Sequence, residues 1–341
     1  MNRNIAALEQ GLRQRLAVNP GDFAALVQLG QLLLQGGSLE ETLSVADRAA
    51  ARNPGHGIPF SLQAMAALRA RFGPPPPPRP LPAGAAISMR TLGANGRFGN
   101  QLLQYAFLKL YARQHGLGAQ TYDWAGRDLF GCDDPFPVRN FPVLDESQAD
   151  LFASLNGQGA VHADRDLSGY FCGHTAHWGD RKAAFRSLFQ PRPAVQAWLE
   201  PAMAELAARG RTLVALHIRR GDFGQGKFWI APADWYANWL AEIWGGLDAP
   251  VLYIASDDPG VSTEFSAFNP VDARDLGAGR LDFYLDHYVL SRARHLAISN
   301  SSFSFTAAML NEKARSLFRP DPTVQALVPF DPWNAEVLLP I

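Results

Sequence analysis

The chain has 341 residues, 47% of them apolar and 18% charged, which is enough for more than one globular domain with a sizeable core. Its formal net charge of −1 gives no electrostatic reason to expect nucleic acid or an anionic membrane as the main partner. Cys132 and Cys172 are too few for a disulfide framework and suit a reducing compartment. The N-terminus lacks the apolar stretch of a signal peptide, and no apolar run is long enough for a membrane span, so we expect a cytoplasmic protein.

Residues 1–73 contain a helical repeat. The segment AVNPG at 17–21 recurs as ARNPG at 51–55, which places Pro20 and Pro54 34 positions apart. Apolar periodicity predicts helices at roughly 2–17, 22–35, 38–52 and 57–71. The period and the small residues Gly30, Ala46 and Ala49 resemble the tetratricopeptide repeat. The alternative is a helical bundle with a coincidental period.

Residues 74–86 are rich in proline, beginning with five consecutive prolines at 74–78. Proline lacks the backbone donor and fixes φ, so this stretch cannot be the interior of a helix or sheet. It predicts a stiff polyproline II linker. We therefore expect residues 1–73 to form a separate helical module, whose deletion leaves nucleotide binding intact.

From residue 87 the pattern changes to alternating strands and helices. Apolar runs predict buried parallel strands at 87–92, 212–218, 250–256 and 295–299, and a helix at about 100–115. This is an α/β pattern with parallel sheets. We expect two Rossmann-like domains, at 87–210 and 211–341.

A glycine-rich turn follows the first of these strands and leads into the helix. Its candidate ligand-binding residues are Gly96, Arg97, Phe98, Gly99, Asn100 and Gln101. Glycine lets the backbone approach a ligand closely, and the N–H groups at a helix N-terminus suit an anion. The spacing is neither that of a dinucleotide fingerprint nor that of a P-loop. The alternative is a tight strand-to-helix turn without a ligand.

The sequence HIRRGD at 217–222 ends the second predicted strand. Ligands of open α/β sheets bind beyond the carboxyl ends of the strands. Arg219 and Arg220 carry permanent charges on planar groups that fit phosphate. His217 and Asp222 flank the pair and could orient it. The alternative is a surface charge cluster.

Two further motifs follow the remaining strands. Asp257 comes directly after the third strand, where a carboxylate can accept hydrogen bonds from a base or ribose, or can end the strand as an Asx turn. The fourth strand leads into a run of hydroxyl and amide groups, which predicts a phosphate cradle or a helix N-cap. The candidates in this run are Asn300, Ser301, Ser302, Phe303 and Ser304.

These motifs together resemble the fucosyltransferase superfamily, most closely the α-1,2-fucosyltransferases, whose relatives are the α-1,6- and protein O-fucosyltransferases. The matching segments are GRFGNQLLQYAF at 96–107, HIRRGD at 217–222, YIASDD at 253–258 and SNSSFS at 299–304, with a looser match at 169–189. The resemblance covers about residues 87–333. Phe305 stands where the family usually has tryptophan, and Cys172-Gly173 where it has Gln-Ser, departures that concern the acceptor and the linkage.

The resemblance implies a GT-B architecture with an acceptor domain at 87–210 and a donor domain at 211–341. It implies inverting transfer of L-fucose from GDP-fucose to a hydroxyl of a glycan or protein, with no metal and no other cofactor. His217, Arg219, Arg220 and Asp222 are then catalytic candidates, since fixed cationic groups must stabilise the charge that develops on the leaving phosphate. His217 and both arginines also join the glycine-motif residues, Asp257 and the run at 300–304 as donor-binding candidates. The general base is left open between Asp222, Asp123 and His217.

Several alternatives remain. The donor could be another nucleotide sugar on the same fold, or the chain could be a non-catalytic interaction protein, which GDP binding would distinguish. Cys172, His174 and His177 could hold zinc, although their spacing is not that of a standard ligand set. The helical repeat could hold a protein acceptor, bind a partner or mediate self-association, and glycan acceptors are equally compatible. The expected role lies in carbohydrate metabolism, including protein glycosylation.

Overall fold

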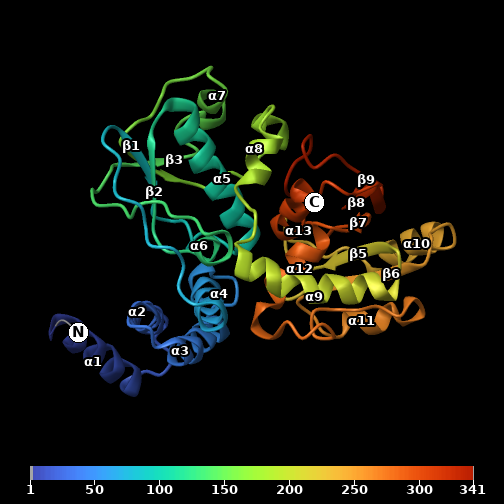
Figure 1. Ribbon diagram of the computed structural model, residues 1–341, viewed down its shortest axis with the longest axis horizontal. Helices are drawn as coiled ribbons and strands as arrows, with labels where there is room; N and C mark the ends of the chain where they lie inside the picture. Colours follow the sequence, from blue (N-terminus) through green and yellow to red (C-terminus); the bar gives the residue numbers. More distant parts are fainter. Residues whose placement is uncertain (1–2, 341) are drawn as a thin grey trace. The chain divides into compact units, whose positions relative to one another are not determined.

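The computed structural model describes residues 3–340, which fall into two compact units (Figure 1). The first comprises the residues up to 149 together with 161–170, and the second comprises 150–160 and the residues from 171 onward. The first contains a parallel sheet and the second a mainly parallel sheet, each with helices, and four helices precede the first sheet, which confirms the predicted fold class. No helix in the described part of the chain is long and apolar enough to cross a membrane.

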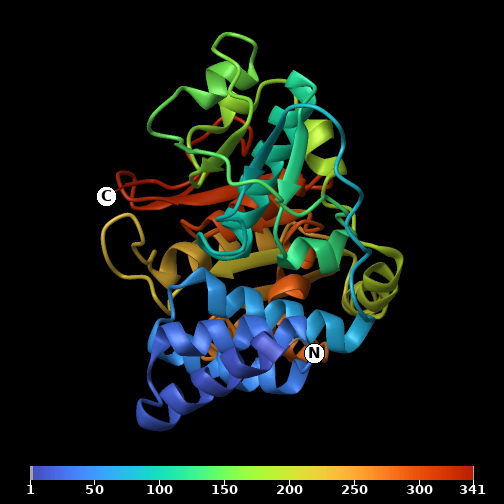
Figure 2. The same ribbon diagram turned by 90° about the vertical axis from the view of Figure 1, so that its left-hand side faces the viewer.

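The four N-terminal helices form close to their predicted positions. They are α1 (Arg3–Val18), α2 (Phe23–Gln35), α3 (Leu39–Arg52) and α4 (Gly57–Phe72). Asp22 caps α2 by accepting a hydrogen bond from the Ala25 amide at 3.0 Å. Leu12, Leu26, Leu29 and Val45 form a buried core between the first three helices, which lie side by side (Figure 2). Their assignment as a tetratricopeptide repeat stays a prediction.

The first sheet has four parallel strands in the order β2-β1-β4-β3. They are β1 (Ala86–Met89), β2 (Gly118–Thr121), β3 (Val143–Asp145) and β4 (Arg165–Ser168). Helix α5 (Phe98–His115) follows β1, and the short helix α6 (Ala125–Phe130) follows β2. The strand predicted at 87–92 and the helix predicted at 100–115 are therefore both present.

Helix α4 packs against this first α/β unit beside α6 (Figure 1). The Arg69 Nε donates to Oδ1 of Asp128, a fully buried carboxylate on α6, at 3.0 Å. The proline segment is tied down as well, because the Arg79 amide donates to the Asp133 carbonyl at 2.7 Å. The structure thus groups residues 3–86 with the first sheet, whereas the sequence predicted a separate module on a linker.

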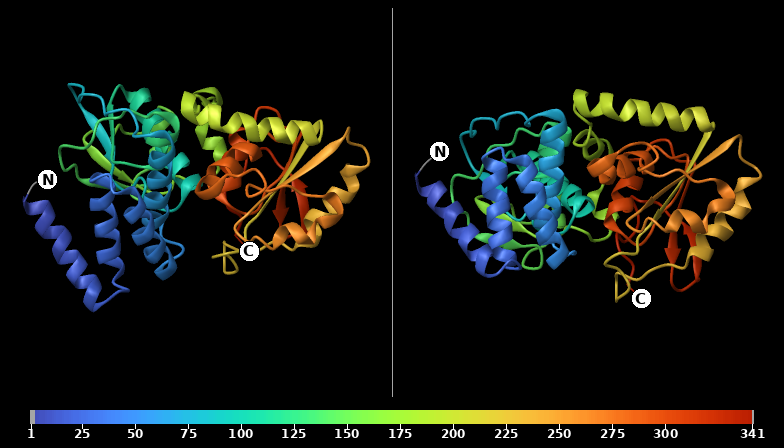
Figure 3. Two further views of the ribbon diagram at one scale, coloured as in Figure 1. Left: turned by 60° about the horizontal axis from the view of Figure 1, so that its bottom comes forward. Right: turned by 90° about the horizontal axis from the view of Figure 1, so that it is seen from below.

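The second sheet has the strand order β6-β5-β7-β8-β9, and only β9 is antiparallel to its neighbour. Its strands are β5 (Thr212–Ile218), β6 (Pro250–Ser256), β7 (His295–Ala297), β8 (Ser316–Asp321) and β9 (Ala326–Pro329). The α-helices of this unit are α7 (Leu151–Leu155), α8 (Lys182–Ser187), α9 (Pro193–Arg209), α10 (Ala233–Trp244), α11 (Val261–Glu264), α12 (Asp282–Leu290) and α13 (Ser302–Leu310). Figure 3 shows α9, in yellow-green, running along one side of these strands.

Alternation along β5 gives its two faces different neighbours. Val214, Leu216 and Ile218 join Trp239 and Leu240 of α10 in one buried cluster. His217 points to the opposite face, where its ring lies 5.2 Å from that of Phe303 on α13. This parity puts His217 and Ile218, the last two residues of the strand, on opposite faces of the sheet.

Residues 171–210 belong to the second unit, whereas the sequence placed the boundary at 210. The reason is a set of contacts with the C-terminal part of the chain. Arg186 Nε donates to the Met309 carbonyl at 2.9 Å, and the Phe185 ring lies edge-on to Trp333 with centroids 5.4 Å apart. The Thr175 amide donates to the Ala335 carbonyl at 2.9 Å.

Replacing Arg69 with alanine should lower the free energy of unfolding by about 3 kcal/mol, because it removes the guanidinium that pairs with the buried Asp128 carboxylate. Arg48→Ala is the control, since this exposed arginine of α3 makes one hydrogen bond to the Pro20 carbonyl. Urea denaturation of both variants measures the difference. Equal stability of the two variants would contradict the buried pair.

Candidate functional site

Strand β5 lies between β6 and β7, so the chain changes direction across the sheet at this point. Parallel register sets Ile218 opposite Ser256, and Leu216 opposite Ala297. The carboxyl ends of the three strands therefore meet at one edge. Ligands of open α/β sheets bind at such a switch point. The three motifs that follow these strands come together here.

Arg219 lies between two carboxylates. Its Nη1 is 3.1 Å from Oδ2 of Asp257, and its Nη2 donates to Oδ1 of Asp222 at 2.5 Å. The guanidinium stacks over the Phe223 ring at 5.3 Å. Arg219 follows Ile218, the last residue of β5, and its charge helps to lower the pKa of His217, whose ring lies beside Phe303 of α13. Phe223 was not singled out from the sequence, although an aromatic residue directly after HIRRGD is a visible signal.

Arg220 is held by α11, whose Val261 packs in the same buried cluster as α10. Its Nη1 and Nη2 donate to the two carboxylate oxygens of Glu264 at 2.5 and 2.8 Å, and Nη1 lies 3.4 Å from Asp258. The hydrogen bond with Glu264 raises the pKa of Arg220 above its ordinary value. Both nitrogens of the fork are therefore engaged within the chain. Glu264 has no local signal in the sequence that links it to the motif.

The backbone of the motif is fixed by Asp257, whose Oδ1 accepts from the Arg220 amide at 2.8 Å. A Cβ added at Gly221 would lie 2.3 Å from Oδ2 of Asp257. Only glycine therefore fits between Arg220 and Asp222 without moving the carboxylate. The aspartate serves as a bridge between the ends of β5 and β6.

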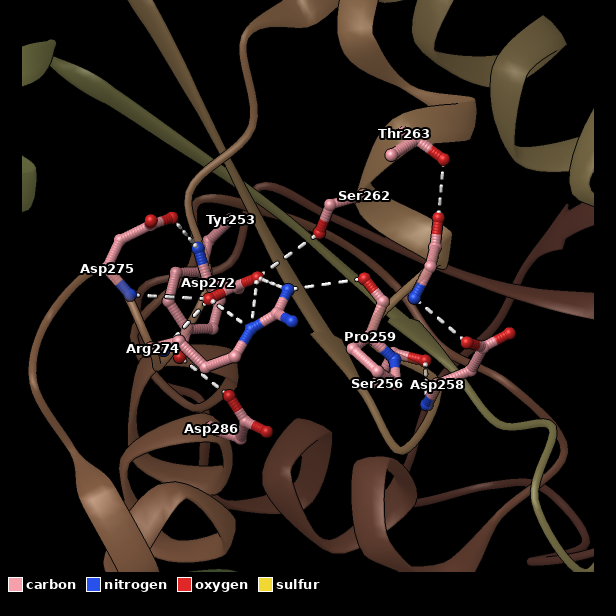
Figure 4. A network of polar contacts seen from close by, with 11 residues as sticks. Tyr253, Ser256, Asp258, Pro259, Ser262, Thr263, Asp272, Arg274, Asp275 and Asp286 are labelled. Carbon is pink, nitrogen blue, oxygen red and sulfur yellow. Dashed lines mark hydrogen bonds and ion pairs between the residues drawn. The ribbon is translucent and has the colours of Figure 1, made fainter.

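A second layer of polar contacts supports the loop after β6 (Figure 4). Asp272 accepts from the Arg274 amide at 2.8 Å and from the Ser262 hydroxyl at 3.4 Å, while Arg274 Nη2 donates to the Pro259 carbonyl at 3.2 Å. Beneath them the Tyr253 hydroxyl donates to Oδ1 of Asp286 at 2.6 Å. Burial raises the pKa of the Asp286 carboxyl. These contacts hold the segment that carries Asp257, Asp258 and Glu264.

His217 is 3% exposed and joins β5 to the motif after β7. Its Nδ1 lies 2.6 Å from the Ser299 hydroxyl and 2.8 Å from the Ser304 hydroxyl. Burial, reinforced by Arg219 and His287, lowers the pKa of His217 from 6.5 to about 3. The ring is therefore neutral near pH 7 and positions the N-terminus of α13.

The segment at 299–304 forms the start of α13. Ser301 is the N-cap, and its hydroxyl accepts from the Phe303 amide at 3.3 Å. Asn300 is turned away from this helix end, since its Nδ2 donates to the carbonyls of Lys227 and Leu339 at 2.8 and 2.9 Å and its Oδ1 accepts from the Leu339 amide at 2.8 Å. Within this run, Asn300 holds the C-terminal segment, whereas Ser301 to Ser304 surround the helix N-terminus.

The glycine motif lies in the first unit, at the carboxyl end of β1. Gly93 and Gly96 have positive φ values of 88° and 70°, which glycine adopts without strain. The buried Gln101 Nε2 donates to the Gly96 carbonyl at 3.2 Å and to the Ser61 hydroxyl at 3.0 Å. Residues 96–101 therefore form the N-terminus of α5, in a different unit from the other candidates.

The zinc alternative is not supported. No three His, Cys, Asp or Glu side chains among residues 3–340 are grouped so that they could hold a metal ion. The His174 and His177 rings lie 6.2 Å apart, and His174 Nδ1 accepts from the Ala176 amide at 3.3 Å. His174 caps the start of a short 3₁₀ segment, Thr175–Trp178, and His177 lies within that segment.

No protein-family model matches the sequence, and no curated protein matches it. Among solved structures, the chain is similar to NodZ α-1,6-fucosyltransferase soaked with GDP-fucose, at 15% identity, 73% coverage of this chain, 99% of that chain and a TM-score of 0.49. Fucosyltransferase NodZ from Bradyrhizobium matches with 15% identity, the same coverages and a TM-score of 0.48. A mutant of Arabidopsis thaliana FUT1 in complex with GDP matches with 12% identity, 76% and 74% coverage and a TM-score of 0.49. Since these TM-scores lie below 0.5, the function proposed below rests on the residues of this chain.

The free energy of unfolding should fall as the pH is lowered from about 6.5. Below that pH the histidines bind protons in the unfolded chain, whereas the same histidines stay neutral while they are buried in the folded chain. Burial lowers the pKa of His287, like that of His217, to about 3. The contribution of these two histidines to the free energy of unfolding is fully present above pH 6.5 and is lost towards pH 3. By about pH 5 the loss is about 2 kcal/mol per histidine.

Urea denaturation at about pH 7.5 and about pH 5 tests this. The His287→Gln variant should lose less stability between the two pH values than the natural chain, by about 2 kcal/mol. The same loss in both proteins would show that His287 is not held neutral.

Proposed function

We propose that the chain is an inverting glycosyltransferase that transfers L-fucose from GDP-fucose to a hydroxyl group, without a metal ion. The observation that carries the proposal is the meeting of three motifs at the switch point of the second sheet. Arg219 contacts Asp257, and His217 contacts Ser299 and Ser304. The site thus combines a fixed guanidinium, a strand-end carboxylate and a helix N-terminus. This combination suits a nucleoside diphosphate.

We infer different roles for the two arginines from their different partners. We place the phosphates between Arg219 and α13, whose N-terminal amides and Ser302 hydroxyl would bind them together with the guanidinium. Arg220 faces α11, and both terminal nitrogens of its fork bind Glu264. We assign Arg219 to the developing charge on the leaving phosphate. Arg220 holds the loop after β6.

The remaining candidates take supporting roles in this mechanism. The neutral, buried His217 aligns α13 with the end of β5, and Asp222 orients the Arg219 guanidinium. Asp257 lies where a base or ribose could be recognised. The glycine motif stays a candidate for donor binding from the first unit. Fucosylation in the α-1,2 linkage, like a cytoplasmic location, stays a prediction.

Arg219→Ala should lower kcat about 10²–10³-fold, as when one donor to a developing charge is removed. Arg219→Lys should also be poor, because an ammonium group cannot replace the planar fork. Arg220→Ala is the matched comparison and should lower thermal stability more than turnover. Initial rates of GDP release from GDP-fucose with an acceptor panel measure these effects. Normal turnover in Arg219→Ala would remove this residue from the site.

Isothermal titration should show the same affinity for GDP with and without excess EDTA, because the phosphate partners that we propose are all groups of the chain. Arg219→Ala serves as the binding control, since it should weaken binding under both conditions. Loss of GDP binding and of turnover on chelation would refute the metal-free mechanism.

A further inference from the structure

Helix α4, the last of the four N-terminal helices, touches the glycine loop of the first α/β unit (residues 93–99) directly. The Ser61 hydroxyl, on a side chain that is 3% exposed, donates to the Gly93 carbonyl at 2.6 Å. It also accepts from Gln101 Nε2 at 3.0 Å, so one hydroxyl links α4, the loop and α5. A Cβ added at Gly57 would lie 2.3 Å from the Gly96 carbonyl oxygen. The helix and the loop therefore fit without room for a larger residue.

Asp123 lies at the same place, just beyond the carboxyl end of β2. Register sets Thr121 of β2 opposite Met89 of β1, so the segments that follow both strands meet. A Cβ added at Gly93 would lie 3.2 Å from the Asp123 carbonyl oxygen and 3.8 Å from the Ser61 hydroxyl. Three segments thus converge on Gly93: the glycine loop, the end of β2 and helix α4.

The Asp123 carboxylate is held by two arginines and remains partly exposed. Its Oδ2 lies 3.4 Å from Arg69 Nη2 of α4, and its Oδ1 lies 3.9 Å from Nε of the buried Arg127. Its side chain is 34% exposed, in contrast to the fully buried Asp128, which Arg69 also binds. Asp128 is part of the interior, whereas Asp123 presents an oriented carboxylate to solvent.

In a parallel α/β sheet, a carboxylate that follows the second strand can lie next to a glycine loop that follows the first strand. A carboxylate in this position can accept hydrogen bonds from sugar hydroxyls. In the second unit, Asp222 and Asp257 contact Arg219, and Asp258 and Glu264 contact Arg220. Each of these carboxylates pairs with an arginine of the HIRRGD motif. Asp123 is a partly exposed carboxylate outside that group, in the α/β unit that would serve the acceptor.

We infer that Asp123 binds a hydroxyl group of a sugar acceptor, and that helix α4 forms part of this acceptor site. Ser61 and Arg69 are positioning residues: Ser61 holds the glycine loop, and Arg69 orients the Asp123 carboxylate. The inference rests on the proposed function, which supplies the donor. It gives the N-terminal helices a role within the transferase rather than that of a separate binding module.

The test uses the full-length chain and four variants. Asp123→Asn removes the charged hydrogen-bond partner, and Ser61→Ala removes the link to the glycine loop. Asp133→Asn is the matched control for the first, because Asp133 is also ion-paired with an arginine of the first unit, Arg79, at 2.9 Å. Gln63→Ala is the control for the second, because Gln63 of α4 donates to Asp47 of α3 at 2.8 Å and so acts within the helices alone.

Transfer from GDP-fucose to a panel of methyl glycosides is measured together with GDP affinity and thermal stability. Asp123→Asn should lower kcat/KM for the sugar about tenfold or more, chiefly through a higher KM for the sugar, because a hydrogen bond to a charged group is lost. Ser61→Ala should act in the same direction to a smaller extent. GDP affinity should stay within about twofold in Asp123→Asn, because Asp123 is not among the donor-binding candidates. Both controls should behave like the natural chain.

Three results would overturn the inference. One is a kcat/KM of Asp123→Asn equal to that of Asp133→Asn. Another is a natural chain that binds GDP but transfers to serine or threonine peptides, or to none of the sugars. The third is a rise in KM for the sugar in Ser61→Ala that is matched by Gln63→Ala, which would reduce Ser61 to a purely structural role. Absence of GDP binding in the natural chain would instead refute the proposed function, and the isothermal titration separates that outcome from the others.

Discussion

The parallel pairing of β5 with both β6 and β7 is the constraint on which the candidate site depends. It brings the carboxyl ends of three strands to one edge, although the residues that follow them are widely separated in the sequence. Because the chain leaves β5 in one direction across the sheet and returns on its other side, the loops diverge and leave space for a ligand. Every contact among the HIRRGD, SDD and SNSS motifs follows from this register.

Two groups make that edge rigid, the buried His217 and the more exposed Asp257. His217 is neutral and joins β5 to two hydroxyls at the start of α13, so the helix end cannot shift without breaking both hydrogen bonds. Asp257 binds the backbone and the side chains of the arginine motif, and Gly221 leaves it no spare room. Preorganised groups of this kind stabilise developing charge without having to reorganise during the reaction.

In the first unit, the ion pair between Arg69 and the buried Asp128 plays the corresponding part. It ties α4 to α6, and the same arginine reaches the more exposed Asp123. Since the hydroxyl of Ser61 binds both the glycine loop and Gln101, the helical region shares its core with the α/β fold. A proline-rich segment in the sequence does not by itself separate two modules, because side chains on either side can still pack together.

The sequence by itself determined the four N-terminal helices, α5 and the strands β1, β5, β6 and β7. Apolar runs, helical periodicity and turn residues are signals that neighbouring residues carry within one element. It also located the motifs at the strand ends. Strands β2, β3 and β4 were missed because they are short and polar, and their pairing with β1 or with one another makes them strands. Only the tertiary structure decided that Arg220 pairs with Glu264, 44 positions away, that Asn300 holds the C-terminal segment, and that α4 contacts the glycine loop. Such contacts depend on distances between atoms of remote segments, which no local pattern of residues encodes.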